Sequence, residues 1–311
     1  MKRTNATSWS RRHGTGRNFL KTSNNSSPES VPQQPERIAG PTSFALTGPS
    51  LGLDPRTHAY RDDVADMALA GKVLAHYYAI PKIKSIAVPV AELYKEQDED
   101  AELGSQLFHG ERFAVVDMTD GWSWGYGLHD HYVGYLHTDA LSDPFDVSHM
   151  VTAPRLDIEG AGALPMGSRI TAVQAENHGD AARPIGQSAP DTVAIAEAFL
   201  DAPYLWGGRT TAGIDCSGLV QLAWSLAGHD LPRDSDLQLD ALAGDVPEGG
   251  ELKRGDIIFF PNHVGLMADA ATLLHATQHH GKVVAEPLGD VVARIAGEHD
   301  QPVTGRKRIG S

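Results

Sequence analysis

The sequence contains one cysteine, Cys216, and the residue types around it suit a nucleophilic thiol. It lies in the segment Gly213-Ile214-Asp215-Cys216-Ser217-Gly218. Asp215 can cap a helix predicted over Ser217–Ala227, which puts Cys216 at the first turn. Free backbone N–H groups and the positive end of the helix dipole favour a thiolate there, so we expect a lowered pKa for this thiol. The alternative is a buried cysteine that begins a core helix, which would not need the polar Asp-Cys-Ser entrance.

A thiolate also needs a partner that exchanges protons near pH 7, and histidine is the natural choice. The chain has 15 histidines, so position must select among them. His263 opens a predicted strand and shares a face with Gly265, which leaves room beside the imidazole. Antiparallel pairing would bring His275, on the next predicted strand, beside His263, where it could fix the tautomer. The competing interpretation is that each is a strand histidine with a structural hydrogen bond.

Further along the chain, several short segments follow one another in a fixed order: Pro203–Gly208, Asp215–Val220, Leu231–Ser235, Arg254–Phe260, His263–Gly265 and Leu274–Ala276. In this order they resemble the NlpC family of cell-wall peptidases. Each is weak alone, but together they are specific, and they span about 190–290. The resemblance implies an α+β, papain-like domain in which the cysteine begins a helix packed on an antiparallel sheet.

The same resemblance implies a function and a set of site residues. It implies a cysteine–histidine–polar triad, carried onto Cys216, His263 and His275, that hydrolyses an amide in a peptidoglycan stem peptide. The expected bond joins γ-D-glutamate to a diamino acid such as diaminopimelate. Tyr204 matches a family tyrosine beside the oxyanion site. Asp215 and Ser217 match positions that hold the free amine of a short peptide, although Asp215 is also explained as a helix cap alone.

Short predicted strands over 85–139, rich in aromatic residues and glycine, resemble a bacterial SH3-like barrel. Such a barrel often precedes the peptidase domain in this family, where it binds wall polymer or closes one end of the cleft. We therefore expect a disordered tail over 1–52, a helical lead-in over 53–84, the barrel over 85–140, a partial second barrel or linker over 141–190, and the peptidase domain over 191–305.

The composition limits the partners. A net charge of −14 argues against nucleic acid, and no apolar run is long enough to insert into a membrane. A single cysteine excludes an intrachain disulfide and a cysteine-based zinc cluster, and His129-Asp130-His131 lacks a third ligand, so we expect no metal or cofactor. The basic N-terminus lacks the apolar core of an export signal, which predicts a cytoplasmic enzyme acting on muropeptides. Export to the cell envelope by an undetected route is the alternative, and no oligomeric state is predicted.

Two other functions remain open from the sequence. An acyltransferase or amidase on the same fold would pass the thioester to an amine or lipid instead of water. In a non-catalytic wall-binding protein, the barrel would bind the cell wall and the C-terminal domain would be a relic without catalytic activity. The presence of Cys216, His263 and His275 together argues against the second.

Overall fold

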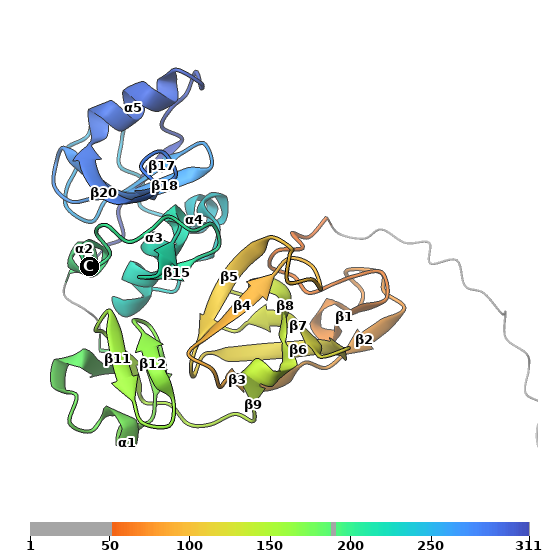
Figure 1. Cartoon of the computed structure of the whole chain (residues 1–311). Coiled ribbons are helices and arrows are strands. Elements are labelled where there is room, and N and C mark those ends of the chain that lie inside the picture. Colours follow the sequence, from red (N-terminus) through yellow and green to blue (C-terminus); the bar gives the residue numbers. More distant parts are fainter. Residues whose placement is uncertain (1–51, 188–190, 311) are drawn as a thin grey trace, which may run out of the picture. The chain divides into compact units, whose positions relative to one another are not determined.

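A computed structural model describes residues 52–187 and 191–310 of the 311-residue chain (Figure 1). The predicted disordered tail over 1–52 therefore lies outside the described residues, apart from Gly52. Among the helices described, none combines the length and apolar content that a membrane span requires.

The helical lead-in predicted over 53–84 is wrong. Its regular elements are β1 (Val64–Asp66), the short 3₁₀ turn η1 (Met67–Leu69) and β2 (Tyr77–Ala79), with β1 and β2 paired in parallel. Gly71 adopts a φ of +80°, which interrupts a helix. The apolar residues that suggested a helix, such as Leu69 and Val73, pack together in a small cluster instead.

A seven-stranded sheet follows, in the order β5-β4-β8-β7-β6-β3-β9. Its strands are β3 (Lys82–Ile86), β4 (Val90–Tyr94), β5 (Leu103–Phe108), β6 (Arg112–Thr119), β7 (Trp122–Gly127), β8 (Val133–His137) and β9 (Leu141–Ser142), with the 3₁₀ turn η2 (Thr138–Ala140) before β9. The predicted Asp120-Gly121 hairpin is confirmed, because both residues have positive φ and Thr119 pairs with Trp122. Strand β5 was not predicted, since nearly all of its residues are buried and its sequence does not alternate.

The region between this sheet and the last domain has its own small core. It contains β10 (His149–Val151), β11 (Arg155–Ile158), β12 (Gly162–Pro165), β13 (Arg169–Ile170), α1 (Ala172–Ala175), η3 (Gly179–Ala181) and β14 (Ala182–Pro184). Strands β13, β10 and β14 form a sheet, while β11 and β12 form a separate hairpin. Val151, Leu164 and Ile170 are completely buried within it.

The C-terminal region has the α+β arrangement expected from the sequence. Helices α2 (Thr192–Glu197), α3 (Cys216–Leu226) and α4 (Ser235–Ala241), with the hairpin β15 (Arg209–Thr210) and β16 (Gly213–Ile214), come first. A five-stranded sheet ordered β20-β19-β18-β17-β21 follows. Its strands are β17 (Ile257–Phe260), β18 (His263–Met267), β19 (Thr272–Thr277), β20 (Lys282–Pro287) and β21 (Gly305–Lys307). Helix α5 (Leu288–Ala296) lies between β20 and β21 in the sequence.

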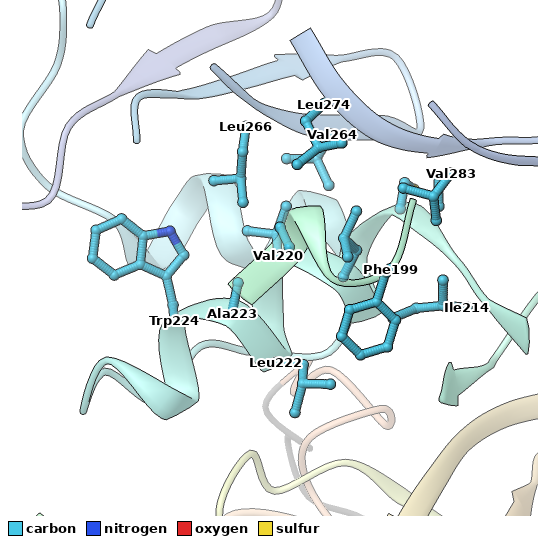
Figure 2. Packing of buried hydrophobic residues seen from close by; sticks show 14 of the residues in the cluster. Phe199, Ile214, Val220, Leu222, Ala223, Trp224, Val264, Leu266, Leu274 and Val283 are labelled. Atoms are coloured by element: carbon cyan, nitrogen blue, oxygen red, sulfur yellow. The ribbon is translucent and has the colours of Figure 1, made fainter. Parts of the chain in front are cut away.

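Helix α3 is the central element of this region because nearly every one of its side chains is buried. Figure 2 shows Val220 and Ala223 of α3 among Val264, Leu266 and Leu274 of the sheet, and all five belong to one buried cluster. A second cluster holds α5, through Val291, against other sheet residues such as Met267. This packing fixes the start of α3 relative to the sheet, and the candidate site depends on that relation.

Candidate active site

Cys216 is the first residue of α3, and Asp215 caps the helix as predicted. The Asp215 carboxylate accepts a hydrogen bond from the Gly218 N–H at 2.7 Å. A side chain at Gly218 would bring its Cβ to 2.6 Å from the Gly208 carbonyl oxygen, so only glycine fits this turn. The Cys216 N–H belongs to the first turn, where N–H groups have no partner within the helix. This geometry leaves a donor beside the thiol for a developing oxyanion.

A buried ion pair holds the Asp215 carboxylate. Arg233 donates to its two oxygens at 2.6 and 3.0 Å, and both side chains are almost fully buried. The Gly207 N–H donates to the same carboxylate at 2.8 Å. These contacts explain Asp215 as a cap and an anchor for Arg233, and they favour that role over direct binding of a substrate amine. Sequence reasoning named Arg233 only within the Leu231–Ser235 motif.

His263 and His275 are brought together as predicted. A tight turn containing Asn262, with φ of +54°, joins β17 to β18 and places His263 at the strand's first position. The His263 Nε2 and His275 Nδ1 atoms are 2.7 Å apart. A Cβ added to Gly265 would lie 3.0 Å from the His275 Cβ and from the Leu273 side chain, so the glycine permits the close packing of these neighbours.

The thiol lies beside the strand end that carries His263. The backbone N–H groups of Ser217 and of Val264, the residue after His263, lie near the sulfur and act to lower the pKa of the thiol. Among the described residues no hydrogen bond joins Sγ to the His263 ring. Such contacts are often loose before substrate binds and tighten in the reacting complex. The His263 Nε2 is occupied by His275, so Nδ1 is the ring nitrogen left for the thiol proton.

The electrostatics of the site contradict the expected lowered thiol pKa. Burial, followed by the negative charge of Asp215, raises the pKa of the Cys216 thiol to about 12. The two backbone N–H groups and Arg233 act in the opposite direction but do not outweigh burial. Burial likewise lowers the pKa of His263 to about 3 and that of His275 to about 4. The resting site therefore holds a neutral thiol and two neutral imidazoles.

Tyr204 and Ser217, the remaining predicted site residues, are also near the nucleophile. Tyr204 is half-buried, and burial together with the charges of Cys216 and Asp215 raises its pKa, so its phenol stays protonated. Ser217 is buried, and its hydroxyl accepts a hydrogen bond from Arg233 at 2.9 Å. The Tyr204 phenol is thus a protonated donor near the thiol, whereas Ser217 belongs to the Arg233–Asp215 network.

A cleft of about 230 Å³ opens over Cys216. Its lining residues include Asp215 and Ser217, but others come from distant segments: Arg56 of the lead-in, Lys95, Gly104 and Tyr132 of the barrel, and Trp206, Asp234 and Asp236. Sequence reasoning named Trp206 and Asp234 only within family motifs. It did not select the other wall residues, because no local pattern indicates a contact between segments so far apart. A larger hollow of about 450 Å³, lined by barrel residues with Thr210 and Ala212, contains no nucleophilic thiol.

Charged side chains organise one wall of this cleft. The Arg56 guanidinium donates to Asp234 at 2.8 Å and to Asp236 at 2.7 Å, and it also binds Asp54. The Tyr132 hydroxyl donates to Asp234 at 3.2 Å. We call these residues, Arg56, Asp54, Tyr132, Asp234 and Asp236, the charged wall. Over residues 52–187 and 191–310, no group of three or more histidine, cysteine or acidic side chains is arranged to hold a metal ion.

Comparison with known proteins agrees with this geometry. Residues 201–294 match the NlpC/P60 family, and this range includes Cys216, His263 and His275. The chain carries an NlpC/P60 domain. Residues 93–141 match the bacterial dipeptidyl-peptidase Sh3 domain, so the predicted NlpC-type domain and the predicted SH3-like domain before it are both confirmed.

Curated relatives match over the NlpC/P60 region. A gamma-D-glutamyl-L-lysine dipeptidyl-peptidase of Bacillus subtilis is 36% identical over 97 residues, which cover 29% of this chain and 32% of the relative. Dipeptidyl-peptidase 6 of Lysinibacillus sphaericus is 33% identical over 100 residues, covering 32% and 36%. The chain thus spans about a third of the length of these relatives.

A crystal structure of an NlpC/P60 family protein from Bacillus cereus shares the fold, with a TM-score of 0.63 at 18% identity. The similarity covers 73% of this chain and 99% of the other. It therefore extends well beyond the NlpC/P60 domain itself, and the predicted α+β fold with an SH3-like domain is confirmed.

Proposed function

We propose that this protein is a cysteine endopeptidase that hydrolyses peptidoglycan stem peptides at the bond between γ-D-glutamate and a diamino acid. The observation that carries the proposal is the placement of Cys216. It begins α3, lines a cleft and lies beside the strand end that bears His263, the hydrogen-bond partner of His275. The names of the curated relatives, gamma-D-glutamyl-L-lysine dipeptidyl-peptidases among them, support the same reaction and substrate class.

The proposed chemistry begins from a neutral pair, because the thiol pKa is raised and the His263 pKa is lowered. The sulfur attacks the γ-glutamyl carbonyl carbon as its proton passes to Nδ1 of His263. The carbonyl oxygen becomes an oxyanion that accepts hydrogen bonds from the Cys216 N–H and the Tyr204 hydroxyl. Loss of one such donor typically raises the barrier by about 2.7–4 kcal/mol.

The tetrahedral intermediate then collapses with cleavage of the C–N bond, and His263 returns the proton to the leaving amine. A water molecule next gives a proton to His263 while its oxygen attacks the thioester carbon. Cleavage of the C–S bond releases the carboxylic acid, and the sulfur regains its proton from His263. His275 binds Nε2 of His263 throughout and so keeps Nδ1 directed to the reacting atoms.

The cleft size favours short, free peptides. Barrel and lead-in residues line the cleft, and its volume of about 230 Å³ is below the range usual for sites that bury drug-sized ligands. A cross-linked wall polymer would have to pass these side chains, whereas a di- or tripeptide end would not. A free muropeptide is therefore the proposed substrate. The predicted cytoplasmic location stays a prediction, which cell fractionation can test.

The test compares free L-Ala-γ-D-Glu-meso-diaminopimelate, its L-lysine counterpart and intact sacculi, with release of L-Ala-D-Glu followed by mass spectrometry. We expect cleavage of a free tripeptide and loss of turnover by at least about 10⁴-fold in Cys216→Ala, as for other removed nucleophiles. Ser225→Ala, on the same helix and partly exposed, is the matched control and should keep wild-type turnover. Cys216-independent cleavage would reject the mechanism, and cleavage of sacculi alone would reject the proposed substrate.

A further inference from the structure

A carboxylate lies behind the histidine pair and is not among the residues predicted from the sequence. Glu286, on β20, accepts a hydrogen bond from His275 Nε2 at 2.9 Å. The two residues are diagonal neighbours across β19 and β20, since His275 pairs with Val284 and Leu273 pairs with Glu286. The His275 side chain is 1% exposed and that of Glu286 is 14% exposed, so this bond is shielded from solvent.

The protein holds this carboxylate in place and keeps it ionised. Arg294, in the last turn of α5, forms a salt bridge with Glu286. His280 approaches the other oxygen at 3.3 Å from the exposed side. The hydrogen bonds from Arg294 and His275 lower the pKa of Glu286 to about 2, against the effect of burial. An ionised carboxylate only accepts hydrogen bonds, and this fixes what His275 must do.

The positions of the protons follow along the chain of hydrogen bonds. His275 must carry its proton on Nε2, because that atom faces the carboxylate. His275 is neutral, so its Nδ1 is an acceptor, and the atom facing it, His263 Nε2, must be the donor. His263 is also neutral, which leaves its Nδ1 unprotonated. This is the tautomer that can take a proton from the Cys216 thiol.

We infer that Glu286, held by Arg294, is a positioning residue that sets the tautomers of His275 and His263 and so keeps Nδ1 of His263 ready to act as the base. The inference rests on the proposed function for its catalytic meaning. The tautomers themselves can be measured without any substrate. A purely structural role, in which the Glu286–Arg294 pair only ties α5 to β20, would leave the two rings free to exchange tautomers.

The test measures the ring nitrogens of both histidines by ¹H–¹⁵N correlation NMR at pH 7. The signals are assigned with His263→Asn and His275→Asn, because the chain has 15 histidines. In the wild-type protein we expect protonated Nε2 and unprotonated Nδ1 on both rings. Glu286→Ala should allow the opposite tautomer of His263, whereas Glu286→Gln keeps a carbonyl acceptor and should retain the wild-type pattern. Glu298→Ala, an exposed site just past α5, is the matched control.

The kinetic expectation is a split between kcat and KM. Glu286→Ala should lower kcat by about 10- to 100-fold, the range found for carboxylates that orient a metal-bound histidine from behind, with KM within about twofold of wild type. Glu286→Gln should recover most of this loss.

The inference is overturned if wild-type His263 carries its proton on Nδ1, or if Glu286→Ala leaves the ring nitrogens unchanged. The wild-type measurement decides the matter even if Glu286→Ala fails to fold. A protein with the expected tautomers that cleaves no stem peptide would reject the proposed function and not the positioning role.

Discussion

Two groups of side chains around Cys216 are of opposite kinds. On the sheet side, the thiol and the two imidazoles are largely shielded from solvent and neutral, and a short hydrogen bond joins the two rings. On the other side, the charged wall joins Arg56 to three carboxylates that are partly exposed, with Asp236 at 62%. Buried hydrogen bonds determine which atom carries each proton. Exposed charges, by contrast, sit on side chains that can move, and salt screens their interactions. The comparison suggests that the first side performs the chemistry and the second selects the substrate.

The contrast between buried and exposed groups should be largest in the free energy of unfolding after an ion pair is removed. Arg233→Ala leaves the buried Asp215 carboxylate without its partner, so we expect a loss of about 3–5 kcal/mol in the free energy of unfolding. Arg254→Ala is the control, because Arg254 makes a comparable pair of contacts with Asp191 and Glu197 at an exposed site. Its loss should be below about 1 kcal/mol. Denaturant unfolding measures both, and equal losses would remove the distinction between buried and exposed pairs.

Thiol reactivity tests whether the sheet side is neutral at rest. With a raised pKa, the Cys216 thiol should react with iodoacetamide at a rate that rises about tenfold per pH unit from pH 7 to pH 9 without a plateau. A preformed thiolate–imidazolium pair would instead give a flat rate across neutral pH. The control is the urea-unfolded protein, whose thiol should titrate near its usual pKa of about 8.5. A plateau in the folded protein below pH 8 would show that the thiol is already ionised.

As the pH falls, the free energy of unfolding should decrease through His263 and His275 before the carboxylates become protonated. His263 and His275 have lowered pKa values in the folded protein, so the unfolded chain binds their protons first as pH falls below about 6.5. The stabilisation from their neutral burial is complete above pH 6.5 and is lost as pH falls toward about 4 and 3. We expect a decrease on the order of 4 kcal/mol between pH 7 and pH 5, about 2 kcal/mol for each ring.

Unfolding measured at both pH values checks this, with a His263→Asn/His275→Asn variant as the control. The variant lacks both titrating rings, so its decrease should be smaller. Glu286 titrates below this window and does not contribute to it. If the variant loses as much unfolding free energy between pH 7 and pH 5 as the wild type does, the acid sensitivity comes from other groups.

The charged wall should give the smallest effect, and mainly on binding. Arg56→Ala removes exposed contacts with Asp234 and Asp236, so we expect KM to rise about two- to fivefold, with kcat unchanged. The free energy of unfolding should change by less than about 1 kcal/mol. Arg155→Ala, which breaks the exposed Arg155–Asp157 pair on β11, serves as the matched control. A fall in kcat without a change in KM would place Arg56 in the chemical step.

The sequence predicted the parts of the site that depend on local order. Asp215 before Cys216 indicated a capped helix, and the spacing of His263 and His275 on adjacent strands indicated a pair. It did not predict the raised thiol pKa, because the helix terminus is a local feature whereas burial depends on the whole fold. Glu286 and Arg56 were missed for a related reason. Each reaches the site through tertiary contacts that no pattern near Cys216 encodes.

The fold shows the same division between local and distant signals. The Asp120-Gly121 turn and the helix after Asp215 follow from residue types over a few positions. The lead-in around Leu69 and Val73 has the apolar content of a helix, but its side chains find partners in a small cluster and its chain turns at Gly71. Strand β5 is almost entirely buried, and its burial depends on tertiary contacts that its own sequence does not show.

The buried, protonated state of Cys216 also affects how long such a protein lasts under oxidative stress. Oxidation to sulfenic acid depends on thiolate content and exposure, and this sulfur has little of either while the cleft is empty. The chain has no second cysteine to trap a sulfenic acid as a disulfide and allow its repair. A protonated, buried thiol therefore protects a side chain that this protein cannot recover through a disulfide of its own.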